Sequence, residues 1–367
     1  MKIALDYQTF CNQSYGGISR YFVRLADELN KLNVETKIFA PLHRNRYISE
    51  LDEKLVKCKE INRYPPKTTR LFLPFNRLVT QQWLKSWHPD VVHETYYARK
   101  TAAPNTTPKV ITVYDMIHEL YAKEFSPRDN TSELKKIAVQ RADHIVCISE
   151  NTRKDLIEIF DLPAERCSVV YLGFDRFSHP YRQQQPLSTQ PYLLYVGARG
   201  GYKNFTALLK AVAASAWLKQ NFHIVAFGGG RFSQTECEQI RQLGLSPEQV
   251  KQVQGDDQLL GRYYTEATAF IYPSIYEGFG IPPLEAMAHD CPVICSNSSS
   301  MPEVVGDAGI YFNPNSREEL TARLEETLQS TEQLQQLKAK GQQRLNFFSW
   351  QKCAQETQQI YQQVLNG

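Results

Sequence analysis

Short apolar runs recur along the chain, and longer stretches with a helical spacing of apolar residues separate them. In the first half, this pattern predicts buried strands at residues 2–5, 35–39, 91–93, 110–113 and 144–148. Strands that alternate with amphipathic helices form parallel sheets with helices on both faces. The first half is therefore predicted to be a Rossmann-like, doubly wound α/β domain.

The same alternation restarts after a polar segment that contains Gln and Pro, at residues 180–191. The pattern predicts further strands at 192–196, 223–227, 252–254, 269–272, 292–296 and 309–312. A chain of 367 residues is too long for one ordinary core. We predict an N-terminal domain at 1–180, a C-terminal domain at 181–349 and a terminal helix at 350–367 that packs back on the N-terminal domain. Because parallel sheets bind ligands beyond the carboxyl ends of their strands, the two sheets are expected to face an interdomain cleft.

The segment 276–288 directly follows a predicted strand and carries two carboxylates, Glu277 and Glu285. Two prolines suit the first turn of a helix, and the glycines before them allow backbone amides to approach a ligand closely. A helix N-terminus attracts a diphosphate, and the carboxylates can then accept hydrogen bonds from sugar and ribose hydroxyls. Taken alone, the glutamates would be a loop charge and a helix-dipole partner. The glycine loop between strand and helix favours the ligand interpretation.

Two cations, Arg199 and Lys203, follow the predicted strand 192–196 in a loop that contains glycines. A guanidinium fork and an ammonium group can neutralise a leaving diphosphate. Two solvated loop cations are the alternative interpretation. Their position at the end of a strand favours the diphosphate role.

These motifs resemble those of the family 4 retaining glycosyltransferases, which have the GT-B fold, and in particular bacterial mannosyltransferase-like enzymes of surface polysaccharide assembly. Glu277 and Glu285, with seven residues between them, resemble the paired-glutamate signature of that family. The resemblance implies transfer of a sugar from a UDP-, GDP- or ADP-sugar to a glycan, glycolipid or lipid-linked acceptor, with retention of anomeric configuration. The implied donor-binding residues are Gly16, Gly17, Arg199, Lys203, Gly278, Phe279, Gly280 and Glu285.

The resemblance also implies which residues lie near the reacting centre. Glu277 is expected to position the donor sugar rather than attack it, because in the family the donor phosphate is thought to deprotonate the acceptor on the same face. Tyr114 and Asp115 stand where many relatives have His followed by Asp, so Tyr114 or His118 takes the place of that His. No cofactor and no metal are expected, since cationic side chains and the helix N-terminus stabilise the diphosphate.

Further candidates lie in the first half. Gly16 and Gly17 follow the first strand and resemble the family's N-terminal glycine loop, although a simple turn is the alternative. His93 and Tyr96 lie at and just after the predicted strand 91–93 and are, with His118, candidates for an acceptor pocket. A packing or surface role is an equal alternative for His118.

The overall charge is nearly balanced, with 42 Lys and Arg against 39 Asp and Glu, which argues against a nucleic-acid partner. Residues 43–87 differ, because ten Lys or Arg stand there against four acids, with aromatic residues among them. This combination suits peripheral contact with an anionic membrane or a lipid-linked acceptor. A solvated helical face with aromatic core residues is the alternative.

The eight cysteines lack paired or metal-ligand spacing and indicate free thiols in a reducing compartment. We found no signal peptide and no apolar run of about 20 residues. A cytoplasmic protein is expected, peripheral at the inner face of the membrane if the basic segment binds lipid. Two other functions stay open: another GT-B enzyme such as an epimerase or a phosphorylase, and a nucleotide-sugar-binding protein that has lost catalysis.

Overall fold

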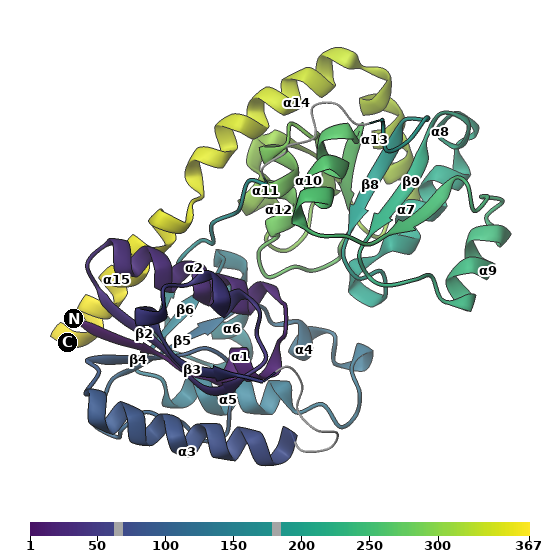
Figure 1. Cartoon of the computed structure of the whole chain (residues 1–367). Helices are drawn as coiled ribbons and strands as arrows, with labels where there is room; N and C mark the ends of the chain where they lie inside the picture. Colours follow the sequence, from purple (N-terminus) through teal and green to yellow (C-terminus); the bar gives the residue numbers. More distant parts are fainter. Residues whose placement is uncertain (62–68, 178–184) are drawn as a thin grey trace. The chain divides into compact units, whose positions relative to one another are not determined.

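The chain divides into two α/β units in the computed structural model of the protein, each built around its own parallel sheet (Figure 1). The structure describes residues 1–61, 69–177 and 185–367. Unit 1 comprises Met1–Gly173 with Ser349–Gly367, and unit 2 comprises Phe174–Phe348. The predicted border between residues 180 and 181 lies outside the described residues.

Among the described residues, the sheet of unit 1 has seven strands in the order β3-β2-β1-β4-β5-β6-β7, all parallel. They are β1 (Lys2–Leu5), β2 (Glu35–His43), β3 (Val56–Glu60), β4 (Val91–Glu94), β5 (Lys109–Val113), β6 (His144–Cys147) and β7 (Cys167–Val169). The strand order reverses between β1 and β4, where Leu5 pairs with His93. The carboxyl ends of these two strands form a topological switch point, the usual ligand position in such sheets.

The helices of unit 1 include its last element, which returns from the far end of the chain. They are α1 (Gln8–Asn12), α2 (Gly17–Lys31), α3 (Thr69–Trp87), α4 (Ile117–Leu120), α5 (Thr131–Arg141), α6 (Glu150–Phe160) and α15 (Trp350–Asn366). Helix α15 packs against α2 (Figure 1), and the rings of Trp350 and Tyr21 lie 6.3 Å apart. A Cβ at Gly173 would collide with the backbone of Trp350, so this glycine permits the close return of α15.

The sheet of unit 2 has six parallel strands within the described ranges, in the order β10-β9-β8-β11-β12-β13. The strands are β8 (Tyr192–Val196), β9 (His223–Phe227), β10 (Val250–Val253), β11 (Ala269–Tyr272), β12 (Val293–Ser296) and β13 (Gly309–Phe312). The helices are α7 (Phe205–Ala214), α8 (Ala216–Asn221), α9 (Gln234–Gln242), α10 (Asp257–Glu266), α11 (Ile281–Ala288), α12 (Met301–Val305), α13 (Arg317–Gln329) and α14 (Thr331–Arg344). Its switch point lies between β8 and β11.

The predicted fold class is confirmed, since both units have the strand order of Rossmann-like sheets. The apolar pattern does not predict β3 or β7, the two edge strands of unit 1. Strand β3 reads Val-Lys-Cys-Lys-Glu and has no buried residue, and β7 is only three residues long. An edge strand has one neighbour and less burial, so it carries a weak apolar signal.

Buried apolar residues fix the strands that lead to the unit 2 switch point. Leu193 and Tyr195 of β8 belong to one core cluster with Phe205 and Leu208 of α7.

In the part of the chain that the structure describes, no helix has both the length and the apolar character to cross a membrane. All eight cysteines lie in the described ranges and are free thiols.

Candidate active site

The switch point of unit 2 joins two of the predicted site residues. Lys203 ends a short 3-10 helix after β8, and Glu277 follows β11. Nζ of Lys203 donates to both carboxylate oxygens of Glu277, at 2.8 Å to Oε1 and 2.9 Å to Oε2. The side chains are 22% and 9% exposed, so water screens this pair less than a surface ion pair. One cation and one carboxylate are thus fixed at the carboxyl edge of the sheet.

A run of serines at 298–300, after the neighbouring strand β12, holds the Glu277 loop. Oγ of Ser299 accepts the N–H of Glu277 at 2.9 Å. Oγ of Ser300 lies 2.9 Å from the carbonyl of Glu277 and 2.8 Å from that of Phe279, which share its one hydroxyl hydrogen. These serines escaped prediction because nothing in their spacing marks them. Their position after a central strand is the only sequence signal.

Helix α11 begins directly after the Glu277 loop. Its N-cap, Gly280, has a φ of 106°, which favours glycine, and a Cβ there would collide with the side chain of Met301. The two prolines that follow Ile281 have no N–H, so backbone donors toward an anion come from the loop before them. Glu285 lies one turn inside the helix, is buried, and accepts a hydrogen bond from Tyr264 at 3.3 Å.

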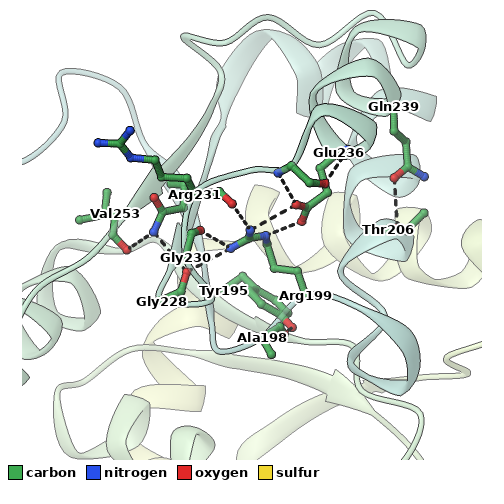
Figure 2. A network of polar contacts seen from close by, with 12 residues as sticks. Tyr195, Ala198, Arg199, Thr206, Gly228, Gly230, Arg231, Glu236, Gln239 and Val253 are labelled. Atoms are coloured by element: carbon green, nitrogen blue, oxygen red, sulfur yellow. Dashed lines mark hydrogen bonds and ion pairs between the residues drawn. The ribbon is translucent and has the colours of Figure 1, made fainter. Parts of the chain in front are cut away.

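The other predicted cation, Arg199, does not join the Lys203–Glu277 pair. Figure 2 shows its guanidinium enclosed by protein acceptors. Nε donates to Oε1 of Glu236 at 2.6 Å, and the two terminal nitrogens donate to Oε2 of Glu236 and to the carbonyls of Gly228, Gly230 and Arg231. The side chain is 5% exposed. This geometry uses the donors of Arg199 inside unit 2 and does not favour the predicted contact with a diphosphate.

The switch point of unit 1 is closed by hydrogen bonds. Oδ1 of Asp6 accepts the backbone N–H of Thr95 at 2.9 Å and its hydroxyl at 2.7 Å, and Oδ2 accepts the amide of Gln8 at 2.7 Å. All three residues are buried. Burial, followed by the nearby charge of Glu94, raises the pKa of Asp6 to about 6. Asp6 is a functional-site candidate that no sequence motif marks.

Tyr114 and Asp115 follow β5 beside this network. The hydroxyl of Tyr114 donates to the carbonyl of Thr95 at 2.9 Å, and burial raises its pKa well above the ordinary value. Asp115 lies 3.9 Å from Nζ of Lys135, which is itself buried. The same Nζ bonds Glu119 at 2.7 Å and the carbonyl of Asp115 at 2.8 Å. Lys135 escaped prediction because it comes from α5, and only the fold brings it beneath the β5 loop.

His93 lies in the core of unit 1 rather than in an acceptor pocket. The ring is fully buried, with Nδ1 at 2.6 Å from the hydroxyl of Tyr361 and Nε2 at 2.8 Å from that of Thr112. Burial lowers the pKa of His93 to about 3. This neutral histidine fastens α15 to the sheet. Tyr96 is half-buried against Tyr97, with ring centroids 4.7 Å apart.

His118 borders a cavity of about 340 Å³ in unit 1, between α4 and α6. Its ring stacks on Phe125 at 4.0 Å, and Nε2 lies 4.0 Å from Asp129. The cavity is also lined by Glu119, Ser126 and Ser132. The Glu119 side chain is 5% exposed, and its Oε1 has no hydrogen-bond partner among the described residues. Aromatic surface and hydroxyl-binding groups therefore meet in one place.

The predicted glycine loop stands at the start of α2, with Gly16 as the N-cap. A Cβ at Gly16 would collide with the side chain of Gln13, whose Oε1 accepts the N–H of Ser19 at 3.3 Å. A Cβ at Gly17 would meet nothing within 4 Å. The atoms that a Cβ at Gly16 would meet belong to the end of the Gln13 side chain, so packing within unit 1 requires glycine at neither position.

Two protein families together match most of the chain. Glycosyltransferase Family 4 matches residues 15–176, and Glycosyl transferases group 1 matches residues 178–344. The chain is a family 4 glycosyltransferase. The Lys203–Glu277 pair lies in the second of the two matched regions. Of the Asp6 network, Asp6 and Gln8 precede the first matched region, and Thr95 lies inside it.

Two named relatives of this glycosyltransferase come from bacteria. It is 29% identical to O-antigen chain mannosyltransferase B of Escherichia coli over 294 residues, which cover 77% of this chain and 76% of the relative. It is 26% identical to O-antigen chain mannosyltransferase RfbU of Salmonella typhimurium, with 82% and 83% covered. Anabaena Alr3699/HepE, solved in complex with UDP-glucose, shares the fold with a TM-score of 0.75 at 18% identity, covering 99% of this chain and 100% of that one.

In the glycosyltransferase, the helix α3 of the basic segment has two different faces. Trp83 and Trp87 pack on Phe39 of β2, with ring centroids 6.4 and 5.2 Å away. Leu71, Phe75 and Leu78 are instead 72%, 48% and 52% exposed. Arg63, Tyr64 and Lys67, which belong to the basic segment 43–87, lie outside the described residues. The aromatic and apolar residues of this helix therefore have two roles. The tryptophans pack in the core, and the residues nearer the start of α3 face outward.

At the edge of unit 2, the glycosyltransferase brings together Lys203, Glu277, the 278–280 loop and Glu285. At the edge of unit 1, it gathers Tyr114 and Asp115 with residues that the sequence did not single out. Among the described residues, His, Cys, Asp and Glu side chains form no group of three or more that could hold a metal ion.

Proposed function

We propose that this glycosyltransferase moves a mannosyl group from a nucleotide-linked mannose to a glycan, glycolipid or lipid-linked acceptor, with retention of anomeric configuration. The observation that carries the proposal is the Lys203–Glu277 pair at the switch point of unit 2, beside the start of α11. The names of the O-antigen mannosyltransferase relatives support mannose. The UDP-glucose complex of Alr3699/HepE supports a nucleotide-sugar donor.

In this proposal, each group of the unit 2 edge meets a different part of the donor. The ammonium of Lys203 and the loop amides before α11 stabilise the diphosphate as negative charge develops on it. The carboxylate of Glu277 accepts hydrogen bonds from sugar hydroxyls, and Glu285 accepts them from the ribose. The cation opposite the diphosphate is a lysine, so the proposal includes no metal and no cofactor.

The reaction exchanges one bond at the anomeric carbon for another on the same face. The bond between that carbon and the diphosphate oxygen breaks, and the bond to an acceptor hydroxyl oxygen forms. The hydroxyl proton goes to an oxygen of the leaving diphosphate. Glu277 stays outside this exchange, because Lys203 already holds both of its oxygens in place.

On the acceptor side, we propose that the cavity beside His118 receives a sugar unit. The stacked rings of His118 and Phe125 offer an apolar surface to the C–H face of a sugar. The carboxylates of Glu119 and Asp129 and the hydroxyls of two serines can bind sugar hydroxyls. Lys135 compensates the charge of Glu119, but the carboxylate of Asp129 would repel a phosphate, so a neutral sugar fits this cavity better than an anionic group. Tyr114 and Asp115 follow β5 in the loop that leads into α4, which carries His118.

We also propose that the outer face of α3 rests on an anionic membrane. Leu71, Phe75 and Leu78 follow helical spacing on one exposed face, and Lys54, Lys57, Lys59 and Lys85 belong to the same basic segment. Replacing Phe75 and Leu78 by serine should reduce pelleting with vesicles that contain phosphatidylglycerol. The same change should leave donor binding intact. Equal pelleting of both proteins would remove this membrane contact.

The function is tested by incubating the protein with mannose linked to UDP, GDP or ADP and with glycans that end in mannose. We expect a glycan extended by one mannose, with NMR showing the anomeric configuration of the donor. Lys203→Ala and Glu277→Gln should lose this product. An inverted product would contradict retention, and donor binding without product from a broad acceptor panel would contradict transfer.

A further inference from the structure

Arg199 makes an unusually complete set of contacts within unit 2. An arginine has five N–H donors, and the Arg199 guanidinium makes five hydrogen bonds. Two go to the carboxylate of Glu236, at 2.6 and 3.3 Å. Three go to backbone carbonyls of the segment 228–231, at 3.0 to 3.2 Å. The ring of Phe232 covers the guanidinium at 4.7 Å.

The segment 228–231, which Arg199 binds, begins with three glycines in an unusual backbone conformation. Gly228, Gly229 and Gly230 have φ values of 85°, 68° and 75°, a left-handed conformation that glycine alone adopts at low cost. Three consecutive glycines also lose more conformational entropy than other residues when they become ordered. Gly228 is also held by Gln252, whose Nε2 donates to its carbonyl at 3.2 Å, and by Val253, whose carbonyl accepts its N–H at 2.8 Å. Arg199 adds three hydrogen bonds to carbonyls of this loop and so restricts it further.

Glu236 ties the same guanidinium to helix α9. Its Oε2 accepts the N–H of Ser233 at 2.8 Å, while Oγ of Ser233 accepts the N–H of Glu236, which completes a capping box. Burial alone would raise the pKa of Glu236, but the hydrogen bonds from Arg199 and Ser233 lower it below the ordinary value. The carboxylate therefore holds both the helix start and Arg199 (Figure 2).

The fixed loop borders the proposed donor site. It follows β9, and Val196 at the end of β8 pairs with Phe227 at the end of β9, so it lies beside the loop that carries Lys203. In a planar peptide the N–H points opposite to the C=O. Since the carbonyls of Gly228 and Gly230 face Arg199, the amides of Gly229 and Arg231 point away from it. The hydrogen bonds from Arg199 thus determine which backbone N–H groups of segment 228–231 can point toward a ligand.

We infer that Arg199 is a positioning residue of the donor site, which acts with Glu236 by clamping the segment 228–231, rather than a ligand of the diphosphate. This inference rests on the proposed function, since it takes the nucleotide-sugar to bind at the carboxyl edge of unit 2. The clamp orders the loop before the donor arrives, so its loss raises the KM for the donor more than it lowers kcat.

A double-mutant cycle tests the clamp by titration calorimetry with UDP, GDP and ADP. Arg199→Ala and Glu236→Ala each break the same clamp, so each should raise the nucleotide Kd about tenfold, and the double variant should be no weaker than either single one. Arg199→Lys should not restore affinity, because one ammonium cannot reach five acceptors. Additive losses, or a loss confined to Arg199, would overturn the clamp and indicate direct contact with phosphate.

Two neighbouring glycines provide a matched pair that keeps both charged residues. A Cβ at Gly229 would lie 2.6 Å from Nη1 of Arg199 and 2.7 Å from the carbonyl of Gly197, whereas one at Gly230 would meet only Gln254, at 4.0 Å. Both alanine variants pay a similar backbone cost, since both φ values are positive. Gly229→Ala should therefore reproduce the affinity loss of Arg199→Ala, and Gly230→Ala should lose clearly less. Equal losses would contradict the clamp.

Salt dependence separates the clamp from the proposed function. Lys203→Ala removes a charge that faces the diphosphate, so its nucleotide affinity should depend less on salt than that of the wild type. Arg199→Ala should keep the salt dependence of the wild type while its affinity falls. If the wild type binds none of the three nucleotides, the proposed function fails and the clamp fails with it. If it binds through Lys203 and Arg199→Ala also loses salt dependence, only the clamp fails.

Discussion

The two switch points of the molecule occupy the same place in two sheets of the same strand order, and they differ in how their charges are compensated. In unit 2, Lys203 and Glu277 neutralise each other and remain partly accessible. In unit 1, Asp6 is fully buried and is bonded to neutral groups of Thr95 and Gln8. The same topology thus supports a charged edge suited to a diphosphate and a closed edge that stabilises the unit.

A switch point provides a place where a ligand can bind, but the residues at it determine whether a ligand binds and which one. A diphosphate needs cations and free donors where charge develops. Among the described residues, the unit 2 switch point has Lys203, whereas Asp6 at the unit 1 switch point is bonded to neutral groups. A buried carboxyl without a cation shifts toward its neutral form, as the raised pKa of Asp6 indicates. Substitutions at the two edges should therefore affect different measurements.

The largest effect is expected from Lys203→Ala. Removing the cation that we propose to face the diphosphate should lower kcat/KM for transfer about 10²- to 10³-fold, which is typical for loss of one group that stabilises transition-state charge. Lys210→Ala is a matched control, because Lys210 is an exposed lysine on α7 of the same unit. A similar loss in both variants would show that overall charge, and not the switch point, governs transfer.

The next effect concerns the stability of unit 1 and its dependence on pH. The folded pKa of Asp6 is about 6 and the ordinary value is 3.8, so the folded state keeps its proton over a window in which the unfolded state has lost it. The free energy of unfolding therefore falls as pH rises through this window, by up to about 3 kcal/mol.

Asp6→Asn stays neutral and should not show this loss. Urea titrations should find that the variant gains about 2 kcal/mol relative to the wild type between about pH 4.5 and pH 7.5. Gln8 can turn its amide to donate or accept, which preserves the hydrogen bond at 2.7 Å. Parallel pH curves for the two proteins would show that Asp6 is not the titrating group.

A smaller effect is expected from Tyr114→Phe, which removes the hydrogen bond to the carbonyl of Thr95. The unit should lose about 1 kcal/mol of stability, and kcat should change less than about threefold, if the hydroxyl serves the closed network. A fall in kcat beyond tenfold at unchanged stability would instead give Tyr114 the catalytic role implied by its place in the sequence.

The smallest effect is expected from Ser299→Ala. The variant loses the hydroxyl that accepts the N–H of Glu277 at 2.9 Å, so the carboxylate is held less firmly. We expect kcat/KM to fall about twofold, with a larger change in kcat than in the nucleotide Kd. An unchanged kcat/KM would mean that the remaining contacts of the loop suffice to position Glu277.

The sequence predicts the parts of the site that follow strands as short motifs. Lys203, Glu277 and the start of α11 could be placed because strand ends meet at one edge of a parallel sheet. The partners of Arg199 could not, because the same basic residue after β8 can turn toward a ligand or toward Glu236 on α9. Ser299, Lys135 and the burial of His93 also depend on long-range packing, which local patterns do not encode.

The most direct test of the central claim is to measure the affinity of the wild type, Lys203→Ala and Glu277→Gln for a nucleoside diphosphate and for its mannose conjugate. We predict that Lys203→Ala binds both ligands weakly, because both carry the diphosphate. Glu277→Gln should bind the diphosphate about as well as the wild type and lose the preference for the mannose conjugate. If neither variant differs from the wild type with either ligand, the unit 2 switch point is not the donor site.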